Sequence, residues 1–325
     1  MLGKLKHKAA VYIYALKDRR KTMAVLNSPA FKKERQFADI IRRVHSIEKG
    51  LCIENPRMGF GIAKLNSLFE LCKSHASEFG NDDYCLKMAR DAIGAYIEFH
   101  NERGYTSDDF KKICEAYADF PCKKDTEDET VYGGALDIKH SCRISIDELE
   151  KFFSDRHSIR CFTDEEVTET EITRAVRAAQ YAPSACNRQG VRSYVLSSAK
   201  LCELYKKYYK NDLSGIGGFA ENTDKFILIT GKLSAYSSSE AYQHIVSASI
   251  FSTYLIEALF SMGIGSCMVQ RPLYHSPQWD DVAKEIGIPE DERLVLMIAV
   301  GKVKDEYKVP VSKRLPTEQI LSFIK

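Results

Sequence analysis

Two arginines and a serine alternate in the second half of the chain, within the segment Arg156-His157-Ser158-Ile159-Arg160. In an extended backbone, side chains two residues apart share a face, so Arg156, Ser158 and Arg160 are expected to point together. The planar guanidinium matches phosphate oxygens, and hydrogen bonds to charged groups contribute about 1.5–3 kcal/mol each. The segment therefore predicts a phosphate clamp, with a polar edge strand as the alternative.

A second segment, residues 182–190, lies between a predicted helix end and a predicted strand and reads APSACNRQG. Its backbone N–H groups and short polar side chains suit the carbonyls and ring nitrogens of a flat heterocycle. The candidate ligand-binding residues are Pro183, Ser184, Ala185, Asn187 and Gln189. Ordinary turn chemistry explains the same composition without a ligand.

Two further signals follow. Gly265 and Ser266 come after a long apolar stretch, and glycine allows a backbone to approach a planar ligand closely. A helix stop explains the neighbouring Gly263 equally well. Near the end of the chain, Lys313 and Arg314 place two cations side by side, for which surface charge is the default explanation.

The elements that must position these segments change character near residue 154. Helical spacing dominates up to about residue 118, and Ser28-Pro29 predicts a helix start. Beyond residue 154, apolar runs of strand length alternate with helices, which indicates α/β or α+β architecture. Capping boxes predict helix starts at Ser145 and Thr168. Strands are expected at 191–196, 226–230 and 294–300, the last two central because both of their faces are apolar.

Three parts are therefore expected along the chain. Residues 1–120 form an all-α domain, and residues 145–325 form an α+β domain with a mixed sheet flanked by helices. Between them, residues 121–144 mix charges with Gly133-Gly134 in a pattern that fits neither period, which predicts a linker.

Taken together and in this order, the four segments resemble the nitroreductase family of FMN-dependent oxidoreductases. The resemblance covers about residues 146–325. It rests on Arg-His-Ser-x-Arg-x-Phe, on Pro-Ser-Ala-Cys-Asn-Arg-Gln, on the helix ending in Gly-Ile-Gly-Ser-Cys, and on Leu-Val-Leu-Met-Ile-Ala-Val-Gly-Lys. No segment before residue 145 takes part. One departure is Gly190, which stands where the family commonly has proline and leads us to expect a looser turn.

The resemblance implies a homodimer that buries FMN at the subunit interface. It assigns the phosphate and ribityl chain to Arg156, Ser158, Arg160 and Arg314, with His157 as a further cofactor-binding residue. Ser184, Asn187 and Gln189, with Pro183 and Ala185 beside them, would come from the other subunit. Gly265 and Ser266 would bring backbone amides to the flavin N5 edge.

The implied activity is hydride transfer from NADH or NADPH, through flavin N5, to a small electron-poor nitro, quinone or enone substrate. The flavin carries the electrons in such an enzyme, so no catalytic acid–base side chain and no metal are expected. A flavin-binding interaction or sensor protein without turnover is the alternative. It would hold the same cofactor without cycling it.

Charge and composition indicate the expected location of the protein and the partners it is not expected to bind. The ten cysteines form no C-x-x-C pair, and no cleavable leader is evident, so we expect a cytoplasmic protein. The basic residues lack an aromatic platform or a helix-turn-helix pattern, so no nucleic acid is expected.

The charge concentrates in the first fifty residues, where thirteen Lys and Arg stand against four Asp and Glu. This segment either docks on the protein's own acidic groups or makes a weak contact with an anionic membrane or a lipid-linked substrate. For the helical domain as a whole, a lid over the flavin that narrows substrate access is one hypothesis, and a dock for an anionic lipid or lipid-linked sugar is another. His45, Glu48 and Lys49 share a helix face, where a local ion-pair network is the ordinary explanation.

Overall fold

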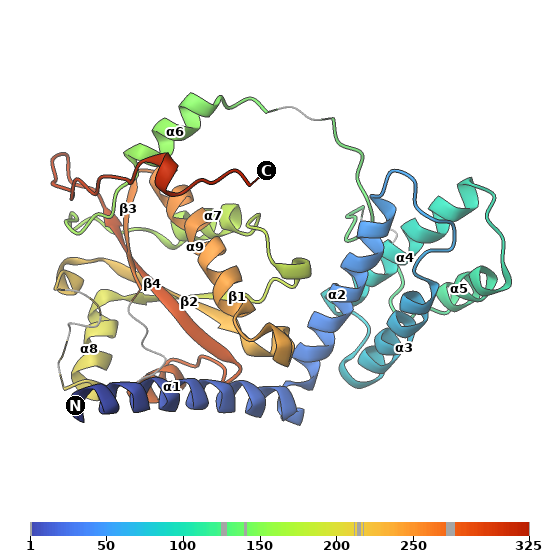
Figure 1. Ribbon diagram of the computed structural model, residues 1–325, viewed down its shortest axis with the longest axis horizontal. Helices are drawn as coiled ribbons and strands as arrows, with labels where there is room; N and C mark the ends of the chain where they lie inside the picture. Colours follow the sequence, from blue (N-terminus) through green and yellow to red (C-terminus); the bar gives the residue numbers. More distant parts are fainter. Residues whose placement is uncertain are drawn as a thin grey trace.

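The computed structural model describes residues 2–124, 129–139, 142–210, 212, 216, 218–270 and 277–324. Helices come first along the chain and the sheet comes second, which confirms the α+β class with a helical N-terminal region. Figure 1 shows helices α2–α5 gathered on one side of the molecule and the sheet on the other.

The N-terminal region consists of α1 (Leu2–Asn27), η1 (Pro29–Phe31), α2 (Lys32–Leu51), α3 (Ile62–Phe79), α4 (Tyr84–Glu102) and α5 (Asp108–Ala118). The hydroxyl of Ser28 accepts a hydrogen bond from the Ala30 N–H at 3.2 Å, which confirms the predicted helix start. Helices α2–α5 bury a core of their own around Ile41, Leu68 and Ile93. His45 and Glu48 form a local pair on α2, with 3.5 Å between Nδ1 and Oε2.

Four strands form one sheet in the spatial order β1-β2-β4-β3. They are β1 (Val191–Ser197), β2 (Lys225–Lys232), β3 (Ile264–Val269) and β4 (Glu292–Lys302), and all neighbours pair antiparallel. An isolated parallel bridge joins Ser158 to Ser266 at the β3 edge, whereas the four described strands form an antiparallel sheet rather than the expected mixed one. Strands β2 and β4 are central, as predicted. Strand β3 escapes the prediction because its glycine-rich start resembles a helix stop.

Helices cover both faces of the sheet. The first layer is α7 (Glu169–Ala179) and α9 (Gln243–Ser261), and the second is α8 (Ser198–Tyr208) and α10 (Pro277–Glu285). Capping boxes at Ser145 and Thr168 start α6 (Ile146–Asp155) and α7, as predicted. By length and composition alone, α9 is the one described helix that could cross a membrane, and the core helices of soluble proteins share these properties.

Helix α1 lies apart from the helical bundle and runs along the sheet-bearing part of the chain (Figure 1). Oδ1 of Asp18 lies 2.6 Å from NH1 of the buried Arg293 at the start of β4. Lys21 Nζ lies 2.9 Å from Oδ1 of Asp280 on α10, so one basic N-terminal residue docks on the protein's own acidic groups. The boundaries at residues 120 and 145 stay predictions.

Candidate functional site

The turn at residues 182–190 holds a concentration of backbone strain. Five non-glycine residues have positive φ within the part of the chain that the structure describes, and three of them are Cys186 (52°), Asn187 (54°) and Gln189 (49°). A left-handed conformation costs such a residue roughly 1–2 kcal/mol, and residues of this kind collect at ligand-binding sites. A fourth, Ser312, has φ 42° and stands two residues before Arg314. Strain thus gathers at two of the segments that the sequence singles out.

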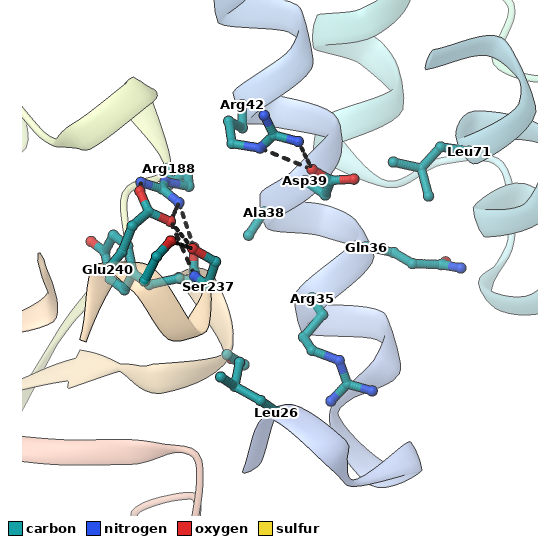
Figure 2. Close-up of a pocket in the computed structure, with 14 residues that line it drawn as sticks. Leu26, Arg35, Gln36, Ala38, Asp39, Arg42, Leu71, Arg188, Ser237 and Glu240 are labelled. Atoms are coloured by element: carbon teal, nitrogen blue, oxygen red, sulfur yellow. Dashed lines mark hydrogen bonds and ion pairs between the residues drawn. The ribbon is translucent and has the colours of Figure 1, made fainter. Parts of the chain in front are cut away.

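A largely buried ion pair holds the turn in this conformation. The Arg188 guanidinium donates to both carboxylate oxygens of Glu240, at 2.9 and 2.5 Å, and to the backbone oxygen of Ala235 at 3.2 Å. These hydrogen bonds from Arg188 lower the pKa of Glu240 to about 2. Figure 2 shows the pair facing α2 across a cavity of about 680 Å³ between the bundle and the sheet-bearing part. The turn is therefore built before any ligand arrives.

Beside the turn lies a second cavity of about 430 Å³, which we name the turn cavity. Pro183, Ser184 and Gln189 line it, and the Gln189 N–H donates to the Ser184 hydroxyl at 3.2 Å. Phe37 from α2 and Tyr84 from α4 line the same space. The helical extension thus contributes two aromatic walls to a cavity that begins at the turn.

The other turn residues take different positions. Ala185 packs against α2 and Tyr236, and Asn187 is exposed. Gly190 is buried, and a Cβ placed there would lie 3.0 Å from the Cβ of Ala235. A larger side chain would therefore be crowded at this position, and the looser turn expected at Gly190 stays a prediction.

Burial raises the pKa of the Cys267 thiol on β3, while the charge of Arg160, a hydrogen bond from Ser158 and the charge of Arg156 oppose the rise. The shared face expected for the three side chains stays a prediction. Arg156 Nε also lies 3.3 Å from Oε1 of Glu257 on α9, and both side chains are only 17% exposed. Glu257 therefore fixes the direction of Arg156.

Arg156 and His157 line a third cavity, of about 770 Å³, together with Arg314 from the C-terminal segment. We name it the clamp cavity. Its wall carries Arg156, Lys313 and Arg314 against the single carboxylate of Glu150. A cavity with this balance of charge favours an anionic ligand.

Gly265 and Ser266 lie inside the sheet. Gly265 pairs with Gly301 of β4, and the backbone oxygen of Ser266 accepts from the Ile159 N–H at 2.9 Å. A Cβ on Gly265 would lie 2.9 Å from Cγ2 of Val303. Packing within the protein therefore explains this glycine, and the contact of residues 265 and 266 with a flavin stays a prediction.

The turn cavity and the clamp cavity have no lining residue in common. Arg160 lines neither of them, and its guanidinium lies 5.9 Å from the centre of the Phe219 ring. One protomer therefore does not bring the candidate residues into a single pocket. The two groups of candidate residues therefore line separate cavities within the described chain.

Sequence reasoning missed Arg188, Glu240 and Glu257. Arg188 stands inside the turn segment as a long cation among small residues, and Glu257 is the only charged residue in the apolar run 245–264. For Arg188 and for Glu257, a single charge in such surroundings indicates a buried ion pair. Nothing near Glu240 in the sequence marks it as the partner of Arg188.

Three side chains of types that bind metals meet in the bundle: His75, Asp83 and Cys85, with ligand atoms within 4.8 Å of one another. Oδ2 of Asp83 lies 3.0 Å from Nε2 of His75 and 3.1 Å from Nζ of Lys33. Oδ1 of Asp83 accepts from the first N–H of α4. A helix cap and an ion pair therefore account for this group.

The family comparison covers the turn and residues 154–160, which line parts of the two cavities. The model of the nitroreductase family matches residues 154–221 and 211–302. The match covers less than half of the chain's 325 residues, so the similarity is confined to this part of it. No curated protein matches the chain.

Solved nitroreductase structures cover the same part. The chain is similar to a nitroreductase-like family protein from Bacillus cereus at 17% identity and a TM-score of 0.47, over 57% of this chain and 100% of that one. An FMN-dependent nitroreductase from Clostridium difficile R20291 gives 24% identity and a TM-score of 0.44, over 54% and 98%. A nitroreductase with bound FMN from Desulfitobacterium hafniense gives 20% and 0.44, over 56% and 100%.

Proposed function

We propose that the chain is an FMN-dependent oxidoreductase that works as a homodimer. The observation that carries the proposal is the coincidence of the nitroreductase-family match with a strained, anchored turn and a cation-lined cavity. NADH or NADPH is the proposed reductant. A small nitro, quinone or enone compound is the proposed acceptor, and the cytoplasm is the proposed location.

The donors of the clamp cavity fit the phosphate of FMN. Three cations, Arg156, Lys313 and Arg314, face a single carboxylate there. Arginine binds phosphate oxygens through parallel charge-assisted hydrogen bonds. In this proposal Arg156 and Arg314 bind the phosphate, and Glu257 holds Arg156 in the direction it needs.

The remaining predicted residues are assigned around the same cofactor. His157, Ser158 and Arg160 would complete the phosphate and ribityl contacts, and the backbone of Gly265 and Ser266 would approach the N5 edge. The second subunit would meet the ring with its turn, through Pro183, Ser184, Ala185, Asn187 and Gln189. When bound, FMN supplies two-electron chemistry, taking a hydride from NAD(P)H at N5 and passing it to the acceptor. The protein's part is to hold the ring and exclude water.

Helix α9 supports the homodimer. It is apolar enough for a protein core, with a mean hydropathy of 1.3, yet only 39% of its most apolar stretch is buried within one chain. Val246 and Tyr254 are exposed on it, Tyr242 is exposed directly before it, and Phe323 and Ile324 are exposed near the C-terminus. Apolar surface of this extent is typical of an interface between subunits.

The helical extension is proposed as a lid. Phe37 and Tyr84 support this role because they line the turn cavity. The rival role, a dock for an anionic membrane or a lipid-linked substrate, would use the exposed basic residues of α1. The ion pairs of Asp18 and Lys21 favour an α1 that packs on the protein itself.

An absorbance spectrum of the purified protein tests the proposal. We expect the visible absorption of a flavin, which bleaches on anaerobic addition of NADH or NADPH and returns with a nitro or quinone acceptor. The double variant Arg156→Ala/Arg314→Ala should lose the flavin, whereas Arg174→Ala, at an exposed position on α7, should keep it. Protein without flavin that binds none in titration would contradict the proposal. Flavin that no reductant cycles would favour the sensor function.

A further inference from the structure

The turn cavity combines residues from both parts of the molecule. The family region contributes the turn, together with Ser247 and Phe251 of α9. The region before residue 145, which the family match does not include, contributes Phe37 and Tyr84. Three aromatic side chains therefore enclose a space of about 430 Å³. This volume suits a small ligand with one flat ring.

The two aromatic residues of the extension are fixed by their own surroundings. Phe37 packs against the core of the bundle. Tyr84 is the first residue of α4, its N–H bonded to Asp83 at 3.1 Å, and its ring meets that of Tyr132 edge-on at 5.4 Å between centres. Each ring is therefore held by the bundle rather than by the sheet.

Charge adds a second element of recognition. The lining of the turn cavity includes the cation Arg192 and no carboxylate. NH1 of Arg192 donates to the backbone oxygens of Gln189, at 3.0 Å, and Val191, at 2.7 Å, which fixes the guanidinium beside the turn. A flat ring that carries an anionic group would meet aromatic faces and a positive charge in the same cavity.

The separation of the two cavities decides which flavin this space serves. The turn cavity and the clamp cavity have no residue in common. In the proposed homodimer, the turn of one subunit meets the flavin whose phosphate the clamp of the other subunit binds. Phe37 and Tyr84 line the turn cavity. They must therefore act where the turn acts, on the flavin held by the partner subunit.

We propose that the helical extension of one subunit forms part of the substrate site of the other subunit. Phe37 and Tyr84 of one subunit cover the flavin whose phosphate the other subunit binds. They select a flat aromatic acceptor with an anionic substituent, which pairs with Arg192. The inference rests on the proposed function and adds to it a substrate class and the subunit that recognises the substrate.

Equilibrium binding tests the substrate class without turnover. Calorimetric titration of 4-nitrobenzoate into the oxidised flavoprotein, with no NAD(P)H present, gives a Kd. Tyr84→Ala and Phe37→Ala should each raise it about threefold to tenfold through the lost ring contact. Tyr84→Phe keeps the ring and should keep the Kd. Arg192→Gln should raise the Kd about threefold for 4-nitrobenzoate but leave that of nitrobenzene unchanged.

The matched control is Tyr12→Ala, which removes an exposed tyrosine of α1 that lines none of the three cavities described above. It should leave both Kd values unchanged. If Tyr84→Ala and Phe37→Ala also bind 4-nitrobenzoate as tightly as the wild type, the assigned substrate site is wrong.

Hybrid dimers test the trans arrangement. One subunit carries Arg156→Ala and the other carries Phe37→Ala/Tyr84→Ala, with different affinity tags for purification. If Phe37 and Tyr84 act on the flavin of the partner subunit, one of the two sites in the hybrid contains all of the substitutions and the other contains none. The hybrid then recovers about half of the wild-type turnover of 4-nitrobenzoate, far above either parent homodimer. If the walls act in cis, both sites are damaged, and the hybrid stays as slow as its parents.

The outcomes separate this inference from the proposed function. Wild-type protein that binds no flavin would remove both. A wild-type flavoprotein that turns over, with a hybrid no faster than its parents, would remove the trans arrangement alone. Circular dichroism of each variant shows whether a loss of activity reflects a loss of fold.

Discussion

The turn at residues 182–190 and the clamp formed by residues 156–160 and 312–316 are built in different ways. The turn is anchored within the protomer by Arg188 and Glu240, and its strained backbone is held in place. The clamp places Arg160 and Arg314 on the exposed surface and fixes only Arg156, through Glu257. The turn is thus preorganised, whereas the clamp is fixed only in part and, in the proposed function, would gain its other partners from the ligand.

The largest effect is expected from a substitution that removes the anchor of the turn. Arg188→Ala leaves the Glu240 carboxylate without its bidentate partner and releases three strained residues. The free energy of unfolding should fall by about 3 kcal/mol, measured by chemical denaturation. Arg174→Ala, at an exposed position of α7, should change it by less than about 0.5 kcal/mol. Equal effects of the two substitutions would show that the turn is not anchored as described.

A second change tests whether the glycines beside the clamp serve packing. A Cβ on Gly301 would lie 2.6 Å from Cγ of Phe162, so Gly301→Ala should lower the unfolding free energy by about 1–3 kcal/mol. Gly218→Ala meets no atom within 4 Å and serves as the control. Unchanged stability of Gly301→Ala, measured by thermal denaturation, would show that Phe162 does not pack closely against Gly301.

The two carboxylates that hold the arginines should respond oppositely to pH. The pKa of Glu240 is lowered to about 2, so its contribution is full above about pH 4.5 and is lost as the pH falls toward 2. Burial raises the pKa of Glu257, so its ionised form costs stability above that raised value, and protonation relieves the cost.

Denaturation between pH 3 and pH 7 measures this contrast. Glu240→Gln should be less stable than the wild type at pH 7, with a difference that shrinks by up to about 1.4 kcal/mol per pH unit below pH 4.5. Glu257→Gln should lose no stability at pH 7. The same pH profile for both variants would contradict the contrast between the two halves.

The smallest effect on stability is expected at the exposed end of the clamp. Arg314 bonds only the backbone oxygen of Ser312, at 2.9 Å, among the contacts within the described residues. Arg314→Ala should leave the unfolding free energy within about 0.5 kcal/mol of the wild type. It should raise the Kd for FMN by tenfold or more, because a charge-assisted bond to phosphate is lost. A normal Kd by flavin titration would take Arg314 out of the clamp.

Local patterns in the sequence predicted much of the fold. Capping boxes at Ser145 and Thr168 are short-range devices, and apolar character on both faces identified β2 and β4 as central. Strand β3 was missed because its pairing with β4 is long-range, while its local sequence begins with glycines. The position of α1 was missed for the same reason, since Asp18 and Arg293 are far apart in sequence.

The sequence predicted which segments form the candidate site, but not the contacts between those segments and distant elements. Alternation predicted one face for Arg156, Ser158 and Arg160, and the charges of both arginines act on the buried Cys267 thiol. The partners that hold the arginines, Glu240 and Glu257, come from distant elements. No local pattern could show that the two halves line separate cavities, because that depends on how the sheet and its helices pack.

Flavin titration combined with sedimentation velocity tests the central claim most directly. If each half of the site comes from a different subunit, FMN binds to the dimer with one molecule per subunit, and dilution to monomer releases it. A monomer that holds FMN tightly, or a dimer that holds none, would contradict this account.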